Sequence, residues 1–237
     1  MRVFVTGVNG QLGHDMLPEL LRRGHEVIAS GSGERYLAAD EAAALPYVQL
    51  NIRNFDAVSR VLTELRPDAV VHCSAWTAVD AAEKAENRAD VFSLNVKGPE
   101  NIARVCRAIG ASMIYISTDY VFGGQGSETW KPDQKDFAPL NVYGQSKLLG
   151  EQAVEANTDK FFIVRTSWIF GVNGKNFIRS MIEAGKTRDS VRVVSDQIGT
   201  PTYTRDLSRL LSDMLEACVN FYQLNSEGCA YPVRHQG

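Results

Sequence analysis

Tyr143 and Lys147 have the residue types and the spacing needed for proton transfer. Residues at positions i and i+4 lie on one face of a helix, so the phenol and the ammonium group point into the same space. A free tyrosine has a pKa near ~10, and a neighbouring cation favours the phenolate. The same spacing also occurs on the surface of ordinary helices. The pair therefore predicts general acid–base chemistry only where other site residues accompany it.

A hydroxyl group accompanies the pair at the end of a predicted strand over residues 113–117. Thr118, Asp119 and Tyr120 follow this apolar run directly. Ligands bind outside the carboxyl ends of the strands in open α/β sheets. The hydroxyl of Thr118 can donate a hydrogen bond to a substrate carbonyl there. We therefore expect Thr118, Tyr143 and Lys147 to form one catalytic site.

A glycine-rich turn follows the first predicted strand, over residues 2–6. Gly7 permits a tight turn, Gly10 lets the backbone approach a pyrophosphate at a helix N-terminus, and Gly13 lets the helix pack close to the sheet. The GxxGxxG spacing differs from the GxGxxG of many dehydrogenases. The alternative is a tight connection without a ligand, but the place after an N-terminal strand favours a dinucleotide.

The choice of cofactor depends on the end of the second predicted strand, over residues 26–30. No acidic residue stands directly there to hold the ribose 2′-OH of NAD. The hydroxyls of Ser30 and Ser32 and the guanidinium of Arg35 are available for a 2′-phosphate, which favours NADPH. In the alternative, Arg35 is a solvated charge and Glu34 binds the ribose of NADH.

Strands and helices alternate along the whole chain. Apolar runs predict strands at 2–6, 26–30, 47–50, 69–73, 113–117, 161–165 and 191–194. Helical spacing predicts helices at 12–23, 55–65, 89–109, 142–156 and 204–218. This order predicts an α/β fold with a doubly wound parallel, Rossmann-like sheet. We expect a dinucleotide-binding domain over 1–168 and a small substrate lobe over 169–237, of which 191–206 can return to the main sheet. The polar stretch 123–138 is a candidate lid.

Composition and charge exclude several classes of protein. The net charge of −3 gives no argument for nucleic acid or membrane partners. The four cysteines form no CxxC pair and the histidines are dispersed, so neither a zinc site nor a disulfide framework is expected. We expect a cytoplasmic protein without signal peptide or membrane span. Asp80, Glu83 and Glu86 could suggest a metal site, but Lys84 and Arg88 among them favour a solvated face.

Seven segments resemble the extended short-chain dehydrogenase/reductases, and among these the dTDP-4-dehydrorhamnose reductase family. They lie at residues 5–13, 75–83, 94–103, 117–124, 139–151, 165–177 and 195–207, and the resemblance spans Met1 to about Cys218. It implies reduction of the C4 ketone of dTDP-4-dehydro-L-rhamnose by NAD(P)H, in the synthesis of nucleotide sugars for cell-surface polysaccharide. It also allows a homodimer. Some relatives bind Mg²⁺ at a dimer contact, but no such ligands can be located here.

The resemblance also implies a role for individual residues. Tyr143 is the general acid, Lys147 holds the nicotinamide ribose, and Thr118 binds the substrate carbonyl. The implied cofactor contacts are Gly7, Asn9, Gly10, Gln11, Leu12, Asn51, Ile52, Ser74, Ala75, Thr77, Tyr143 and Lys147, which join Gly13, Ser30 and Arg35 from the glycine turn and the second strand; the family more often has Asp where Asn51 stands. The implied substrate contacts are Thr77, Val79, Thr118, Asp119, Tyr120, Tyr143 and Trp168. Trp168 could instead serve packing, and we expect Asn95 to brace a neighbouring backbone.

Two rival functions remain open. A non-catalytic relative serves as an NADP-binding regulatory subunit of methionine adenosyltransferase, so the same scaffold could be a binding module. Intact Thr118, Tyr143 and Lys147 favour an enzyme. The second rival is a reductase or epimerase that acts on another nucleotide sugar.

The end of the chain departs from the resemblance. Residues 220–228 still resemble the short strand and turn of the family, whereas residues 229–237 have no helical period and are interrupted by Pro232. Family members continue for several tens of residues. We therefore expect a shortened substrate lobe, with NADPH binding kept and reductase activity weak or absent.

Overall fold

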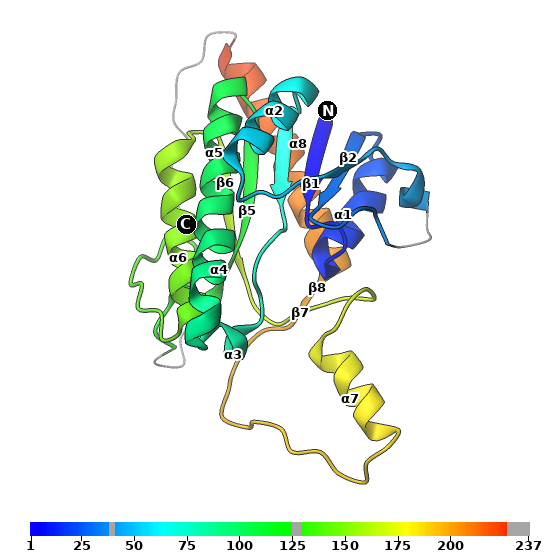
Figure 1. Cartoon of the computed structure of the whole chain (residues 1–237), viewed down its shortest axis with the longest axis vertical. Coiled ribbons are helices and arrows are strands. Elements are labelled where there is room, and N and C mark those ends of the chain that lie inside the picture. The colour runs from blue at the N-terminus through cyan, green and yellow to red at the C-terminus, as the bar shows by residue number, and fades with distance from the viewer. Residues whose placement is uncertain (38–40, 125–128, 227–237) are drawn as a thin grey trace.

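A six-stranded parallel sheet forms the centre of the molecule (Figure 1). The structure, a computed structural model, describes residues 1–37, 41–124 and 129–226. The strands are β1 (Arg2–Thr6), β2 (Glu26–Gly31), β3 (Tyr47–Gln49), β4 (Ala69–His72), β5 (Ser112–Thr118) and β6 (Phe161–Thr166). Their order across the sheet is β3-β2-β1-β4-β5-β6. The chain adds β2 and β3 on one side of β1 and β4, β5 and β6 on its other side, so the strand order reverses between β1 and β4. The predicted doubly wound, Rossmann-like sheet is confirmed, and its reversal point is where such sheets bind ligands.

Helices cover both faces of the sheet. On one face lie α1 (Gln11–Arg22) and α8 (Thr204–Ser226), and on the other α2 (Phe55–Leu65), α5 (Gly98–Ile109) and α6 (Val142–Asn157). Alternation along β1 explains the two layers: Val3 and Val5 pack toward α1, and Phe4 packs toward α2. The predicted helix at 89–109 is continuous, but it consists of α4 (Arg88–Phe92), a π-helical turn η3 (Ser93–Lys97) and α5. Short elements fill the connections: η1 (Glu41–Ala44), α3 (Val79–Ala82), η2 (Ala85–Asn87) and η4 (Asp119–Val121).

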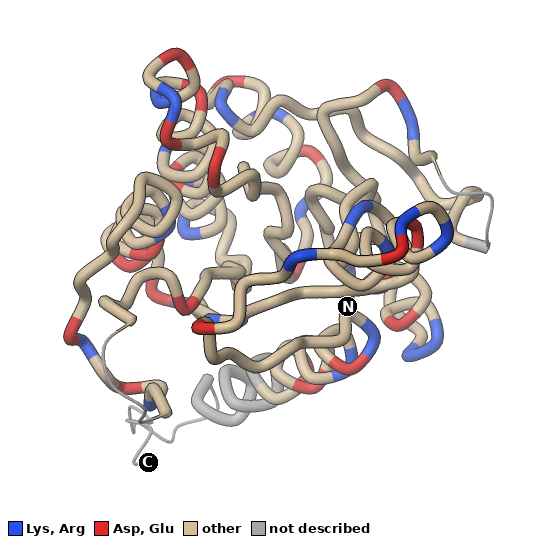
Figure 2. The backbone as a smooth tube through the Cα atoms, turned by 90° about the horizontal axis from the view of Figure 1, so that it is seen from below, with Lys and Arg blue, Asp and Glu red and all other residues tan. Residues whose placement is uncertain are grey.

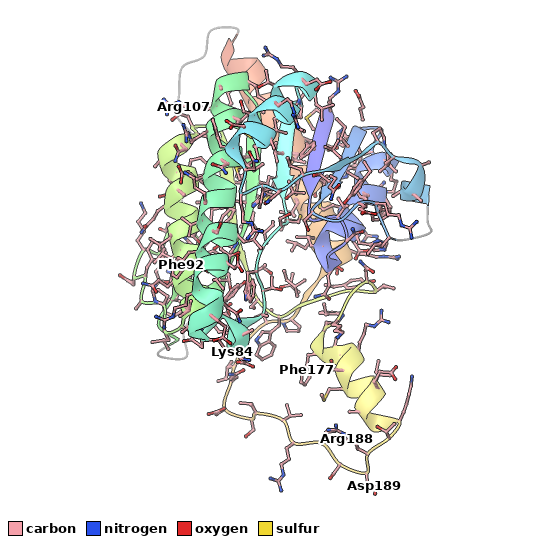
Figure 3. The ribbon with its side chains drawn as sticks, viewed as in Figure 1. Lys84, Phe92, Arg107, Phe177, Arg188 and Asp189 are labelled. Atoms are coloured by element: carbon pink, nitrogen blue, oxygen red, sulfur yellow. The ribbon has the colours of Figure 1, made fainter. Side chains whose placement is uncertain are left out.

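A second, two-stranded sheet pairs β7 (Ile169–Phe170) with β8 (Thr202–Tyr203). Between them α7 (Phe177–Gly185) and the following loop extend away from the main sheet, as Phe177, Arg188 and Asp189 show in Figure 3. The strand predicted at 191–194 is wrong: these residues are exposed, and no described strand pairs with them. Residues 191–206 therefore add no strand to the main sheet.

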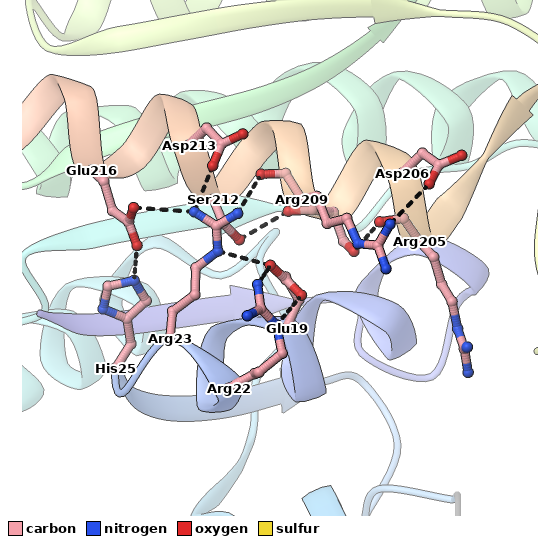
Figure 4. A network of polar contacts seen from close by, with 11 residues as sticks. Glu19, Arg22, Arg23, His25, Arg205, Asp206, Arg209, Ser212, Asp213 and Glu216 are labelled. Carbon is pink, nitrogen blue, oxygen red and sulfur yellow. Dashed lines mark hydrogen bonds and ion pairs between the residues drawn. The ribbon is translucent and has the colours of Figure 1, made fainter.

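Helix α8 is fastened to α1 by an apolar seam and an ionic network (Figure 4). Leu211 and Leu215 are fully buried against α1. Arg23, just after α1, places its Nη1 2.6 Å from Asp213 and 3.1 Å from Glu216 on α8. Its Nε lies 2.7 Å from Glu19 on α1. Although α8 follows the small sheet in the chain, it packs as part of the main α/β layer. The division after residue 168 stays a prediction.

The C-terminal part of α8 corrects another expectation. The strand and turn expected at 220–228 are wrong over 220–226, which are helical. No glycine or proline stands between Thr204 and Ser226, so nothing interrupts the backbone hydrogen bonding. Residues 227–237, including the segment around Pro232, lie outside the described residues.

Acidic and basic residues are interspersed along the backbone (Figure 2). Within the described residues, no helix combines the length and the apolar character needed to cross a bilayer. The predicted lid begins beside β5, where Phe122 forms an isolated bridge with Phe137, and its residues 125–128 are not described.

Candidate functional site

The first turn of α6 brings Tyr143 to the end of β5. Asn141 caps the helix, since its Oδ1 accepts the N–H of Gly144 at 2.7 Å. A Cβ on Gly144 would lie 2.3 Å from the carbonyl oxygen of Tyr120, so only glycine allows this close approach. The ring of Tyr143 consequently meets that of Tyr120 edge-on, with 5.8 Å between centroids. The hydroxyl of Thr118 lies near enough to lower the pKa of the Tyr143 phenol. The structure therefore unites the predicted phenol and hydroxyl.

Burial controls the acidity of Tyr143. The pKa of the phenol is raised to about 12. Burial is the main cause and the charge of Asp119 adds to it, whereas Thr118 acts in the opposite direction. Burial likewise raises the pKa of Asp119. The lowering of this pKa that we expected from Lys147 stays a prediction. A phenol that keeps its proton at neutral pH is a proton donor.

Lys147 is buried on the same helix, one turn after Tyr143. Its Nζ donates a hydrogen bond to the carbonyl oxygen of Ile116 at 2.7 Å and lies 4.0 Å above the ring of Tyr115. Burial lowers the pKa of Lys147 to about 7, while the charge of Glu151 acts in the opposite direction. Lys147 therefore changes charge near neutral pH.

The glycine turn has the shape and the free donors that a pyrophosphate needs. Gly7 adopts a φ of +70°, and a Cβ on Gly13 would lie 2.4 Å from the Gly7 carbonyl oxygen. Gly10 is the N-cap of α1, and neither a side-chain cap nor an acidic residue occupies the first turn. The N–H groups of that turn, at Gln11, Leu12 and Gly13, therefore face an anion site with the positive end of the helix dipole. These residues fit a dinucleotide cofactor.

Asn9 joins the glycine turn to the loop after β2. Its Nδ2 donates to the carbonyl oxygen of Arg35 at 3.0 Å, and its Oδ1 accepts the N–H of Leu37 at 2.9 Å. The side chain of Arg35 is exposed. Ser30 is 1% exposed, and its Oγ has no hydrogen-bond partner within the described structure. Of the side chains expected at a 2′-phosphate, Ser32 and Arg35 thus reach solvent, and Ser30 does not.

The remaining predicted cofactor residues follow the carboxyl ends of β3 and β4. Asn51 is exposed and its Oδ1 accepts the N–H of Arg53, whereas Ile52 is buried against Gly98. The N–H of Ser74 donates to the Oγ1 of Thr6 on β1. Ala75 and Val79 are half-buried and Thr77 is exposed. They lie along the edge that carries the glycine turn.

Trp168 combines packing with exposure. Its ring lies against Gly199, where a Cβ would come within 2.8 Å of it, yet 47% of the residue remains exposed. The backbone of Trp168 has a φ of +45° and its carbonyl oxygen accepts the N–H of Thr202. The expected contact of Trp168 with substrate stays a prediction.

The expected bracing role of Asn95 is confirmed. Its Oδ1 accepts the N–H of Trp76 at 2.7 Å, and its Nδ2 donates to the Trp76 carbonyl oxygen and to the Oγ of Ser146. Glu83 likewise has a specific contact rather than only a solvated one, because it accepts the N–H of Val142 at the start of α6. Within residues 1–37, 41–124 and 129–226, no group of three or more His, Cys, Asp or Glu is arranged to hold a metal ion.

Two asparagines that we assigned no role contact the glycine turn from the loop before α7. Nδ2 of Asn173 donates to the carbonyl oxygens of Asn9 and Gly10, and Nδ2 of Asn176 donates to Oε1 of Gln11. Their amide side chains in a glycine-containing loop were the available signal, but their distance of over 160 residues from the turn hid the contact.

A model of the RmlD substrate binding domain family matches residues 1–229. The chain belongs to this family. This RmlD-family chain is 42% identical over 212 residues to the dTDP-4-dehydrorhamnose reductase of Streptomyces griseus, covering 89% of this chain and 64% of that protein. It is 36% identical to the spore coat polysaccharide biosynthesis protein SpsK of Bacillus subtilis, covering 96% of this chain and 74% of that one. The chain thus spans about two thirds to three quarters of these relatives.

Solved structures agree with this membership. A dTDP-4-dehydrorhamnose reductase from Clostridium acetobutylicum matches the RmlD-family chain with a TM-score of 0.82 at 37% identity, covering 92% of this chain and 71% of that one. The Bacillus anthracis dTDP-4-dehydrorhamnose reductase, solved in complex with NADP, matches with a TM-score of 0.81 at 39% identity, covering 91% and 71%. The RmlD-family chain therefore shares its fold with these two dTDP-4-dehydrorhamnose reductases.

Proposed function

We propose that this chain binds NADPH and reduces the C4 ketone of dTDP-4-dehydro-L-rhamnose, as a cytoplasmic enzyme of nucleotide-sugar synthesis. The observation that carries the proposal is a protonated Tyr143 beside Thr118, with Lys147 one helical turn away, on the sheet edge that also bears the glycine turn. The names of the relatives and the NADP complex of one of them support the same reaction.

Each residue of the proposed site has one task. NADPH, when bound, supplies the hydride. The hydroxyl of Tyr143 donates its proton to the ketone oxygen as negative charge develops there, and the hydroxyl of Thr118 donates a hydrogen bond to the same atom. In the structure the Thr118 hydroxyl donates to the carboxylate of Asp119 at 3.1 Å, so it must rotate toward the substrate. Lys147 would bind the ribose hydroxyls of the cofactor.

The test compares wild type with Tyr143→Phe in an NADPH-oxidation assay with the sugar nucleotide. Loss of the general acid should lower turnover by about 10²–10⁴-fold and leave the dissociation constant for NADPH nearly unchanged. Tyr203→Phe is the matched control, because Tyr203 stacks on Phe170 in the small sheet and has no part in the proposed proton transfer. A Tyr143→Phe variant that keeps most of the turnover removes Tyr143 from the mechanism.

A further inference from the structure

A buried carboxylate that the proposed reaction does not use lies behind the site. Glu151 stands one helical turn after Lys147 and is 2% exposed. Its Oε1 accepts hydrogen bonds from the Oγ of Ser117 and from the Nε of Arg165, the latter at 2.9 Å. Its Oε2 accepts from Nη2 of Arg165 at 2.7 Å. The carboxylate therefore links α6 to β5 through Ser117 and to β6 through a bidentate contact with Arg165.

The other titratable groups around Lys147 are neutral at physiological pH. Burial lowers the pKa of His72 to about 3 and raises the pKa of the Cys73 thiol to about 12, both at the end of β4. Burial also raises the pKa of Tyr115 on β5 and of Tyr143 on α6. The charges near Lys147 are thus Glu151, on its own helix, and Arg165, on β6, which pairs with Glu151.

The contacts of Glu151 leave the amine of Lys147 available. Ser117 and Arg165 occupy the oxygens of the carboxylate, and the Nζ of Lys147 donates instead to the Ile116 carbonyl oxygen. Opposite charges four residues apart in a buried region attract strongly even without direct contact. Without this negative charge, the buried lysine would face the half-buried guanidinium of Arg165, and the neutral amine would be favoured.

We propose that Glu151, fixed by Ser117 and Arg165, is a positioning residue that keeps Lys147 in its ammonium form and free to bind a ligand. What Lys147 binds rests on the proposed function; how its charge is maintained does not. The coupling to Lys147 agrees with the direction in which Glu151 acts on the pKa of that residue.

Two substitutions separate this role from that of a simple structural link. Glu151→Gln keeps the shape and removes the negative charge, so Lys147 should lose its proton at a lower pH. Arg165→Met removes the competing cation and keeps an apolar stem against the rings of Phe122 and Phe137. Lys147 should then hold its proton to a higher pH. A structural link alone predicts weaker folding in both variants and no opposed shifts.

The experiment follows the Lys147 side chain by NMR across a pH series in the full chain with isotope-labelled lysine, using Lys147→Met to assign the signal. We expect a midpoint about one pH unit lower in Glu151→Gln and higher in Arg165→Met, where one unit is tenfold in proton affinity. Glu100→Gln, which removes a half-buried carboxylate on α5 that pairs with the exposed Lys97, should leave Lys147 unchanged. An unchanged midpoint in Glu151→Gln overturns the proposal. If that variant does not fold, an unchanged or lower midpoint in Arg165→Met does so.

NADPH titrations over the same pH range keep the two proposals apart. If Lys147 binds the cofactor through its ammonium group, the dissociation constant should weaken about one pH unit earlier in Glu151→Gln than in wild type. A wild type that binds no NADPH would refute the proposed function, whereas the NMR midpoints would still decide the role of Glu151.

Discussion

Tyr143 and Lys147 are both shielded from solvent on α6, and burial moves their pKa values in opposite directions. The pKa of the phenol rises to about 12 and that of the ammonium falls to about 7, so each residue is driven toward its neutral form. For Tyr143 this preserves the proton that a general acid must give. For Lys147 it costs the charge on which ligand binding depends, so that folding and function oppose each other at this residue.

Lys147→Met should therefore change the pH dependence of stability. The folded pKa of Lys147, about 7, lies below its ordinary value of 10.5, so between these pH values the unfolded chain binds more protons than the folded one. The free energy of unfolding of wild type should rise through this window, with a slope approaching ~1.4 kcal/mol per pH unit. The destabilisation caused by the buried ammonium group is greatest below about pH 7. The variant lacks this dependence, as urea unfolding at about pH 6.5 and about pH 9 can measure. Parallel curves for wild type and Lys147→Met would contradict the buried cation, and Lys97→Met provides an exposed comparison.

Arg35→Ala should change the choice of cofactor. The exposed guanidinium lies on a loop whose backbone Asn9 ties to the glycine turn, so it can meet a 2′-phosphate without ordering the loop first. A charge-assisted hydrogen bond of this kind is worth about 1.5–3 kcal/mol, or roughly 10- to 150-fold in NADPH affinity, with NADH unaffected. Dissociation constants for both cofactors measure it, with Arg107→Ala on α5 as a distant control. Equal wild-type affinities for NADPH and NADH would end the argument for Arg35.

At the scale of elements, the contact between α6 and η4 sets the geometry of the site. Gly144→Ala places a Cβ 2.3 Å from the backbone oxygen of Tyr120, so α6 must shift away from η4. We expect a loss of about 1–3 kcal/mol in stability and a larger proportional loss of turnover than of NADPH affinity. Gly185→Ala is the control, because its added Cβ meets nothing within 4 Å. Full activity in Gly144→Ala would show that the helix tolerates the shift.

Periodicity predicted the elements whose residues pack against the main sheet. The helix over 55–65 was predicted to the residue, because Val58 and Leu62 face the core at helical spacing and Asn54 caps its start. The apolar run at 191–194 does not form a strand, because such a run specifies a strand only where a neighbouring strand accepts its hydrogen bonds. Tyr143 and Lys147 were found through their local spacing. Glu151 was given no role, because it stands on α6 and its partner Arg165 on β6, and no local pattern pairs the two.

At the scale of the whole molecule, α8 connects the end of the described chain to its beginning. The hydroxyl of Thr204, at the first residue of α8, donates to the buried carboxylate of Asp15 on α1. The asparagines before α7 contact the glycine turn, so the segment around α7 is attached to that turn on its N-terminal side and to α1 through Thr204 on its C-terminal side. The small sheet and α7 are therefore a long insertion before a helix of the main layer, and the core needs both parts of the chain.

Leu211→Ala tests this dependence. Leu211 is fully buried between α8 and the sheet, and removing its side chain should cost about 2–5 kcal/mol. Because the cavity lies in the core shared with β1, β2 and α1, the loss should affect the whole α/β domain. Thermal unfolding is followed by circular dichroism with and without NADPH. The variant should show one transition, at a lower temperature than wild type. Saturating NADPH should stabilise the variant by the same free energy as it stabilises wild type.

The neighbouring residue supplies the control. Leu210 is 52% exposed on the same helix, so Leu210→Ala has the same chemistry and the same change in helix propensity without a buried cavity. Its midpoint should stay close to that of wild type. Two separate transitions in Leu211→Ala, with the NADPH-stabilised one unmoved, would mean that α8 unfolds by itself as part of an independent lobe. In that case the division after residue 168 would hold for stability as well as for chain order, and the ionic network around Arg23 would be a contact between two domains.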